Sequence, residues 1–350
     1  MKILFEVKNV SKPNSLPKLK TGVELIDLGG GKTFVGNLKH GIQIENIPIS
    51  LLRLFNGRRT YKQISELTLV QEPELDELIE LLSNHGLLDL YPTKLIFEDR
   101  YNTKVTEKDI AMRDFNMKLN SELTTSLWRN KVNDGGKVLI SKRQDFAIKL
   151  EGDEEFRINL YLQLLASGFN SVEIDIPRDV QLDDLRTGQL HLSDAGKPTN
   201  SVLDGLAKYR KLFNSDSTKK DPDLLIFFGR PTEKEIQKWL SLGISHLTIE
   251  SIGPNIVVGP LVIPGQSPCL NCVAKVDTKI LRNIKEISAF QKPAIGALNW
   301  ITGYLNLVIA EFVDTGNSPL IGSAKVFDVV NPNEIRDIKY PRHPACGCNW

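Results

Sequence analysis

The stretch Leu224-Leu225-Ile226-Phe227-Phe228 ("LLIFF") is an unbroken run of apolar residues. Such a run is typical of a strand that is buried on both faces of a parallel sheet. The residues that follow predict a helix over 232–242, which ends at Gly243, and then a strand over 246–249. This alternation of strand and helix predicts a doubly wound α/β domain.

The same alternation extends upstream of this strand. Val138–Ile140 is predicted to be the first strand, Glu154–Ala166 a helix that stops before Gly168, and Val172–Ile176 a further strand. Downstream, the mostly apolar stretch Lys292–Val313 predicts a long buried helix. We therefore place the α/β domain at residues 137–350.

Residues 1–92 predict a separate, smaller α+β module. Its expected elements are an N-terminal strand within 1–7, a β-hairpin around 23–37, a strand over 40–45, helices over 49–55, 61–67 and 73–85, and a closing strand over 87–90. Strands followed by three short helices and a strand indicate a winged helix-turn-helix. A polar connector, 93–136, with a helix over 107–129, is expected to join the module to the α/β domain.

The hairpin contains a stretch, Leu28-Gly29-Gly30-Gly31-Lys32-Thr33, that superficially matches a phosphate-binding loop. That loop requires a first glycine five positions before its second, and Ile26 stands there instead. The residues after Thr33 do not predict the helix that must follow. The glycines are therefore expected to form a hairpin turn.

Composition excludes several classes of function. The chain has 350 residues, of which 41% are hydrophobic and 25% charged, and a formal net charge of +1, so neither nucleic acid nor an anionic membrane is an expected partner. No apolar run reaches the ~20 residues that span a bilayer, and no secretory signal is recognised at the N-terminus. We expect a cytoplasmic protein.

The four cysteines fall into two close pairs, Cys269-x-x-Cys272 and Cys346-x-Cys348. Two such pairs can present four thiolates to one tetrahedral Zn²⁺ ion, and a cytoplasm disfavours disulfides. The second pair is tighter than usual, which leaves His343 as an alternative ligand. With four protein ligands, the zinc site would be structural and would not catalyse.

A family resemblance rests on Val258–Cys272 ("VGPLVIPGQSPCLNC"), on the predicted helix Lys292–Val313, on Val326–Asp328 and on His343–Cys348. These segments resemble the E1-like (ThiF-type) superfamily, and more narrowly the E1-like component of thiazole/oxazole-modified microcin cyclodehydratases. The module over 1–92 is similar to the PqqD-like recognition element that binds leader peptides of ribosomally made natural products. Its stretches Leu54–Thr60 and His85–Leu88 are typical of that element.

The resemblance implies an ATP site that this sequence does not keep. Adenylating E1-like enzymes have a Gly-x-Gly-x-x-Gly turn after the first strand. If that strand is Val138–Ile140, no glycine follows before Gly152. The acidic, Arg and Gln residues that follow the family's second strand have candidate counterparts in Asp175, Asp179, Arg186 and Gln189. We therefore expect no ATP and no catalytic residue.

The resulting hypothesis is a non-catalytic, leader-binding scaffold for a bacteriocin-type pathway. The resemblance implies as partners a precursor leader peptide, a YcaO-type cyclodehydratase that acts on Cys, Ser or Thr, and a flavin dehydrogenase, and it implies a homodimer. The leader would add as a strand to a sheet edge and lie against the third helix. The residues predicted to bind it are Ile42, Gln43, Ile44 and Glu45 on the strand, with Leu75, Leu78, Ile79 and Leu82 of the helix behind it. The spacing of these four helix residues, i, i+3, i+4 and i+7, also predicts one buried stripe, so some of them are expected in the core.

Two alternatives belong to other classes of function. An adenylating enzyme of the E1 type would activate a peptide carboxylate with ATP, and the missing glycine turn argues against it. A winged-helix DNA regulator would need a third helix that tolerates phosphates. That helix carries Glu74, Asp76, Glu77 and Glu80, which DNA would repel.

Overall fold

A computed structural model describes residues 14–68, 70–90, 119, 121–126, 128–129, 132, 134–207, 221–276 and 293–348. The chain divides into two compact units, the first made of residues 1–106 and 116–140 and the second of residues 107–115 and 141–350. None of the described helices is both long and apolar enough to cross a membrane. The strand predicted within 1–7 and the start of the helix predicted over 107–129 lie outside the described residues. Residues 121–126 of that helix are helical.

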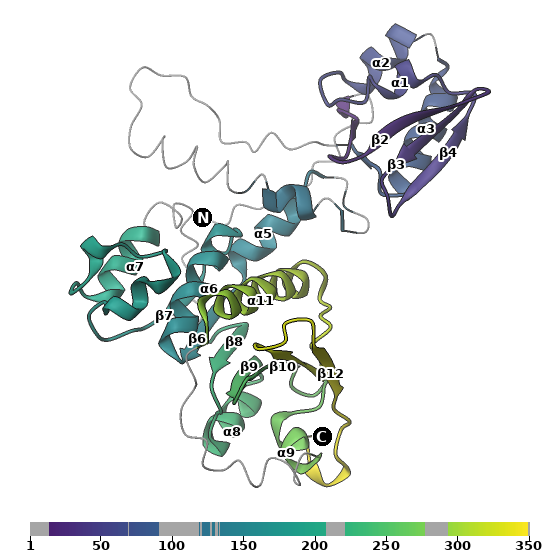
Figure 1. Ribbon diagram of the computed structural model, residues 1–350. Coiled ribbons are helices and arrows are strands. Elements are labelled where there is room, and N and C mark those ends of the chain that lie inside the picture. Colours follow the sequence, from purple (N-terminus) through teal and green to yellow (C-terminus); the bar gives the residue numbers. More distant parts are fainter. Residues whose placement is uncertain are drawn as a thin grey trace. The chain divides into compact units, whose positions relative to one another are not determined.

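The first unit contains a three-stranded antiparallel sheet of order β2-β3-β4 and a two-stranded ladder, β1-β5 (Figure 1). Its elements are β1 (Lys18–Leu19), β2 (Glu24–Gly29), β3 (Lys32–Gly36), β4 (Gly41–Glu45), α1 (Ile49–Leu52), α2 (Tyr61–Thr68), α3 (Glu72–Asn84) and β5 (Leu88–Asp89). The hairpin predicted at the three glycines is confirmed. Gly29, Gly30 and Gly31 all have positive φ, a conformation that glycine adopts without a steric penalty.

The core of the first unit lies between the sheet and its three helices. Val35 and Ile44 from the sheet share a buried cluster with Leu52, Ile64 and Leu75 from the helices. Alternation along the strands explains this, because every second residue of β3 and β4 points toward the helices. The sheet thus has one apolar face for the helices and one face that carries exposed residues.

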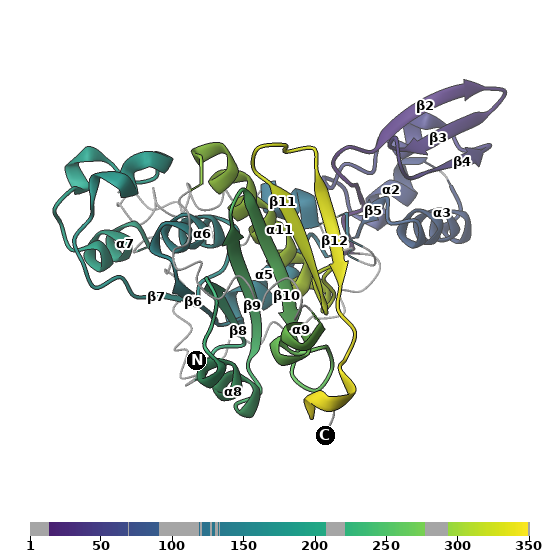
Figure 2. The same ribbon diagram turned by 60° about the horizontal axis from the view of Figure 1, so that its bottom comes forward.

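The second unit is built on a seven-stranded sheet of order β12-β11-β10-β9-β8-β6-β7 (Figure 2). Strands β7, β6, β8 and β9 are parallel, and β10, β11 and β12 continue the sheet as an antiparallel extension. The strands are β6 (Ile148–Gly152), β7 (Val172–Ile174), β8 (Leu224–Phe228), β9 (Ser245–Ile252), β10 (Asn255–Val262), β11 (Ser323–Asp328) and β12 (Ile335–Lys339). The expectation of an α/β fold with parallel strands is confirmed.

The helices of the second unit cover both faces of this sheet. The α-helices are α5 (Lys137–Asp145), α6 (Glu154–Ala166), α7 (Thr199–Ala207), α8 (Glu233–Ser241), α9 (Leu270–Val276) and α11 (Ile295–Thr315), and the 3₁₀ helices are η2 (Leu182–Thr187), η3 (Leu192–Asp194) and η5 (Pro344–Cys346). Helix α5 begins in the first unit and ends in the second.

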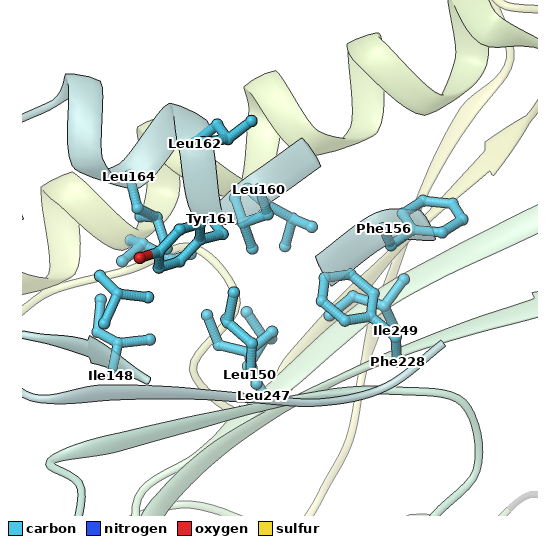
Figure 3. Packing of buried hydrophobic residues seen from close by; sticks show 14 of the residues in the cluster. Ile148, Leu150, Phe156, Leu160, Tyr161, Leu162, Leu164, Phe228, Leu247 and Ile249 are labelled. Atoms are coloured by element: carbon cyan, nitrogen blue, oxygen red, sulfur yellow. The ribbon is translucent and has the colours of Figure 1, made fainter. Parts of the chain in front are cut away.

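Strand β8 shows how the two layers form. Leu224, Ile226 and Phe228 belong to the cluster that contains α6 and α11, whereas Leu225 packs with Trp239 of α8. Consecutive residues of a strand point to opposite faces, so an unbroken apolar run buries both of them. Figure 3 shows the first layer, in which Phe156 of α6 stacks on Phe228 at a ring distance of 5.4 Å.

The first strand of the sheet was predicted at the wrong place. Val138–Ile140 lies in α5, because the Asp134 carboxylate accepts hydrogen bonds from the backbone N–H groups of Gly136 and Val138 (3.0 Å each) and starts a helix there. The first strand is β6, Ile148–Gly152, whose apolar residues alternate with Lys149 and Glu151. That alternation was the available signal, and the apolar triplet at 138–140 obscured it.

A buried ion pair joins α5 to the end of α11. The Arg143 Nε and Nη2 atoms donate to the two carboxylate oxygens of Asp314 at 2.8 and 2.7 Å, and Nη1 donates to the carbonyl of Ser167 at 3.0 Å. Both charged side chains are almost completely buried. The bidentate geometry provides the close pairing that a buried guanidinium requires.

We predict that Asp314→Ala lowers the free energy of unfolding by about 3–5 kcal/mol, because it leaves a buried arginine without its counter-ion. The double variant Arg143→Met/Asp314→Leu should lose much less, since no unpaired charge remains. Urea unfolding of the full chain measures both. Asp337→Ala is the matched control, because it removes a surface partner of Lys325 and should cost less than about 1 kcal/mol. Equal losses for Asp314→Ala and Asp337→Ala would contradict the prediction.

Candidate functional site

The two cysteine pairs meet in the second unit. Cys269 precedes α9, Cys272 lies in its first turn, and η5 and the residues after it bring Cys346 and Cys348 against them. The sulfur atoms of Cys269 and Cys272 are 3.8 Å apart, and the Cys269–Cys346 and Cys272–Cys348 distances are 3.3 and 3.4 Å. All four lie within 4.8 Å of one another, which makes a group that can hold a metal ion.

The spacing fits a thiolate tetrahedron. Zinc–sulfur bonds of about 2.3 Å place the sulfur atoms of such a tetrahedron about 3.8 Å apart. A disulfide is much shorter, at about 2.05 Å, and all four thiols are free. Cys269 and Cys272 are buried, and Cys346 and Cys348 are partly exposed. The four side chains provide a complete donor set for one soft or borderline cation.

Of the two roles that the sequence leaves to His343, an alternative ligand or a capping residue, the structure shows the capping contact. The Nδ1 atom of its ring accepts a hydrogen bond from the backbone N–H of Ala345 at 3.2 Å. The backbone N–H of His343 donates to the sulfur of Cys272 at 3.3 Å. The histidine therefore shapes the tight C-x-C turn and stabilises a thiolate. The four sulfur atoms form the donor set without it.

The ionisation of the thiols is uneven. Burial raises the pKa of Cys272, but hydrogen bonds from the backbone N–H groups of His343 and Cys269, together with those from the Cys348 and Cys346 thiols, lower that pKa to about 7. Burial and the neighbouring thiols raise the pKa of Cys346 and of Cys348. One thiolate forms readily and then opposes the next, a repulsion that a bound cation would remove.

The first unit provides a second candidate site, the free edge of β4. This strand pairs only with β3 among the described residues. The register pairs Ile42 with Val35 and Ile44 with Thr33. The bond from the N–H of Asn46 to the carbonyl of Gly31 (2.8 Å) fixes the alternation, which turns the backbone groups of Ile42 and Ile44 toward β3.

The same alternation turns the N–H and C=O groups of Gly41, Gln43 and Glu45 away from β3, toward the free edge. The side chains of Gln43 and Glu45 are exposed, and that of Ile44 is buried. The edge therefore offers a row of backbone donors and acceptors to an added strand.

The helix residues predicted to stand behind this strand lie in the core, as their helical spacing predicts. Leu75, Leu78, Ile79 and Leu82 of α3 are at most 6% exposed and pack in the cluster of the first unit. Leu81, which is 39% exposed, is the apolar residue that α3 leaves on its surface, and it was not predicted. The adjacent leucines 81 and 82 were the signal, because only one of them can face the core.

A third candidate site is the crevice at the carboxyl ends of the parallel strands. The strand order changes direction between β6 and β8, and in doubly wound sheets ligands bind at this switch point. Because β6 is the first strand, the relevant turn is Gly152–Glu155. Gly152 is the only glycine in it, so the glycine pattern that wraps a nucleotide's phosphates is incomplete.

Charged side chains that follow β6 and β7 at this end of the sheet bind one another. The Arg178 guanidinium pairs with Glu154 and makes a bidentate contact with Asp184 (2.6 and 2.9 Å), and Arg186 pairs with Glu155 at 3.2 Å. The pKa of Arg178 is raised, chiefly by its hydrogen bonds with Asp184. We call this set the crevice network; its members are Glu154, Glu155, Arg157, Arg178, Asp184 and Arg186.

The N-terminus of α6, where a phosphate would bind, is also occupied. The Asp153 carboxylate accepts hydrogen bonds from the N–H groups of Glu155 (3.2 Å) and Phe156 (3.5 Å). Glu154 and Glu155 add two carboxylates in the first turn. A triphosphate would have to displace the Asp153 cap and compete with Glu154 and Glu155 for the arginines that pair with them, so the residues do not fit ATP.

The remaining residues predicted as remnants of a nucleotide site are engaged within the chain. Asp175 accepts a hydrogen bond from Asn200 (2.8 Å), Arg186 also donates to the Pro293 carbonyl (3.0 Å), and Gln189 donates to Asn159. Asp179 is exposed, and its backbone bridges to Pro198. The structure brings none of them to an open phosphate site.

Neither a family model nor a curated protein matches the sequence. Solved structures are similar in fold. The heterocyclase TruD superposes with a TM-score of 0.61 at 14% identity, covering 95% of this chain and 42% of TruD. E. coli MccB with ATP superposes at 0.62 and 15% identity, and MccB with MccA-N7isoASN at 0.63 and 14%; each covers 95% of this chain and 99% of MccB. The chain therefore shares the fold of MccB over nearly its whole length and spans less than half of TruD.

We predict that Cys272→Ser removes the bound metal and lowers the melting temperature by about 5–10 °C, because it takes one donor from a four-thiolate site. A chelator should lower the melting temperature of the unaltered protein by a similar amount. Elemental analysis and thermal unfolding measure the two effects. His343→Ala is the control and should keep the metal, since its ring nitrogen is bound to Ala345. Unchanged metal content in Cys272→Ser would exclude the thiols as ligands.

Proposed function

We propose that the protein is a non-catalytic subunit that binds the leader of a ribosomally made precursor peptide and presents it to a YcaO-type, ATP-dependent cyclodehydratase. That partner would phosphorylate an amide oxygen as the side chain of the next Cys, Ser or Thr closes onto the carbonyl carbon. The observation that carries the proposal is the free edge of β4 beside α3. A winged-helix module of this kind would bind the leader by strand addition.

The fold comparison supports the same class of pathway. MccB has been solved with the peptide MccA, and TruD is a heterocyclase. On the basis of these similarities in fold, we propose for the present chain a role in the modification of ribosomally made peptides and a precursor peptide as its partner. Leader binding would raise the local concentration of the core peptide at the partner enzyme. The subunit would therefore contribute affinity for the precursor and would not itself catalyse the reaction.

The metal centre has a structural role in this proposal, with zinc as the expected ion. The ion would link η5 and Cys348 to α9. These residues are distant in sequence from the proposed leader-binding module. The four donors come from the chain itself, so no coordination position is left for a substrate.

An adenylating enzyme is the second candidate. It is favoured by the match to 99% of the length of MccB, a protein solved with ATP. The crevice network and the Asp153 cap oppose it, because they place carboxylates where phosphates would lie.

We predict that titration of the full chain with ATP and Mg²⁺ in a calorimeter gives no binding at micromolar concentrations. The physical reason is that a triphosphate would have to displace the Asp153 cap and break the ion pairs of Glu154 and Glu155. E. coli MccB, which has been solved with ATP, is the positive control. A micromolar dissociation constant for the present chain would support the adenylating enzyme over the scaffold.

Binding to the free edge of β4 has a backbone-specific test. We predict that Gln43→Pro weakens binding of the leader encoded beside the gene by at least about tenfold, because proline removes an N–H that faces the added strand. The ladder with β3 does not use that N–H, so the protein should remain folded. Fluorescence anisotropy with a labelled leader measures the affinity.

Gln43→Ala is the matched control, because it keeps the N–H and removes only the exposed side chain. It should bind the leader normally. Thermal unfolding confirms that both variants are folded. Equal affinities for Gln43→Pro and Gln43→Ala would exclude pairing at this edge.

A further inference from the structure

The two flanks of α3 differ in what covers them. On one flank, the Tyr61 hydroxyl of α2 donates to the Glu72 carbonyl at 3.2 Å and lies close to the Asp76 carboxyl, which together with burial raises the pKa of Tyr61. The other flank carries Glu74, Glu77 and Leu81, which are spaced i, i+3 and i+7 and so form one stripe. All three are exposed. We call this stripe the open flank.

The open flank lies on the side of α3 that α2 does not cover. Ile44 of β4 packs in the same core cluster as the buried leucines of α3, so α3 lies against the face of the sheet to which Ile44 points. A strand added to the free edge of β4 would extend the sheet over α3. Its side chains that point toward the helix would therefore reach the open flank.

The charge of the open flank is not compensated within the described residues. Glu74 and Glu77 form no ion pair there, and α3 contains no lysine or arginine. Glu45 on the other face of the sheet differs, because Lys32 pairs with it at 3.1 Å. A peptide with positive charge toward α3 would complement these carboxylates, and one with negative charge would be repelled.

We propose that the peptide bound along β4 carries Lys or Arg residues at positions that face Glu74 and Glu77, next to an apolar residue that packs on Leu81. This inference rests on the proposed function and adds the chemistry of the peptide. The backbone of β4 supplies pairing that any sequence can use. The open flank of α3 supplies the selection among sequences.

A displayed library of random 16-residue peptides tests this chemistry with the full chain as bait. Selected peptides should be enriched in Lys and Arg next to an apolar position, and their binding should weaken as salt rises. The double variant Glu74→Lys/Glu77→Lys should bind a selected peptide on the order of tenfold more weakly. Exchange of that peptide's Lys residues for Glu should restore binding to the variant.

Glu80→Lys is the control for overall charge, because Glu80 is exposed on the same helix, one turn from Asp76 and on the side of α2. It should change the affinity by less than about threefold. Two outcomes would overturn the inference and leave the proposed function intact: selected peptides that bind at the β4 edge without basic residues, or selected peptides that bind Glu74→Lys/Glu77→Lys and Glu80→Lys equally well. Failure of the library to yield any peptide sensitive to Gln43→Pro would count against the proposed function itself.

Discussion

At the switch point of the sheet, the backbone of β8 lies so close to Gly152, the last residue of β6, that no side chain fits at this position. Gly152 has a φ of 92°, and a Cβ atom there would lie 2.0 Å from the carbonyl oxygen of Phe228. The next N–H, that of Asp153, donates to the same carbonyl at 2.9 Å. This contact fixes the start of α6. It thereby places the Asp153 cap and the carboxylates of the first turn over the crevice, and it brings Phe156 onto Phe228.

Prediction from sequence succeeded where one element had one dominant signal. The limits of β8 and α6 match the predicted residues, because an unbroken apolar run and an Asp–Gly-bounded helix have few alternatives. It failed at residues 138–140, where an apolar triplet with two β-branched residues resembles a strand and the decisive Asp134 cap lies four residues before Val138. Because the first strand was placed too early, the glycine-rich turn was also sought at the wrong residues. At the correct position, Gly152–Glu155, the glycine pattern is incomplete as well.

The candidate sites divide in the same way. The spacing of the cysteine pairs was enough to predict that they share one centre, since each short turn already holds two thiols together. The crevice network could not be predicted, because its arginines and carboxylates come from separate segments that only the folded chain brings together. The helical period identified the buried leucines of α3, but it did not tell which neighbouring leucine stays at the surface.

The crevice network gives a physical reason for separating recognition from catalysis in the proposed subunit. A helix N-terminus and several arginines attract anions, and in this chain Glu154, Glu155 and Asp184 are those anions. Their charges are covalently held and already paired, so an external phosphate must first break ion pairs that are partly buried. The free edge of β4 has no such internal partner among the described residues. In the proposed function, the free edge of β4, and not the crevice, would therefore be the place that accepts a ligand, in the form of a peptide strand.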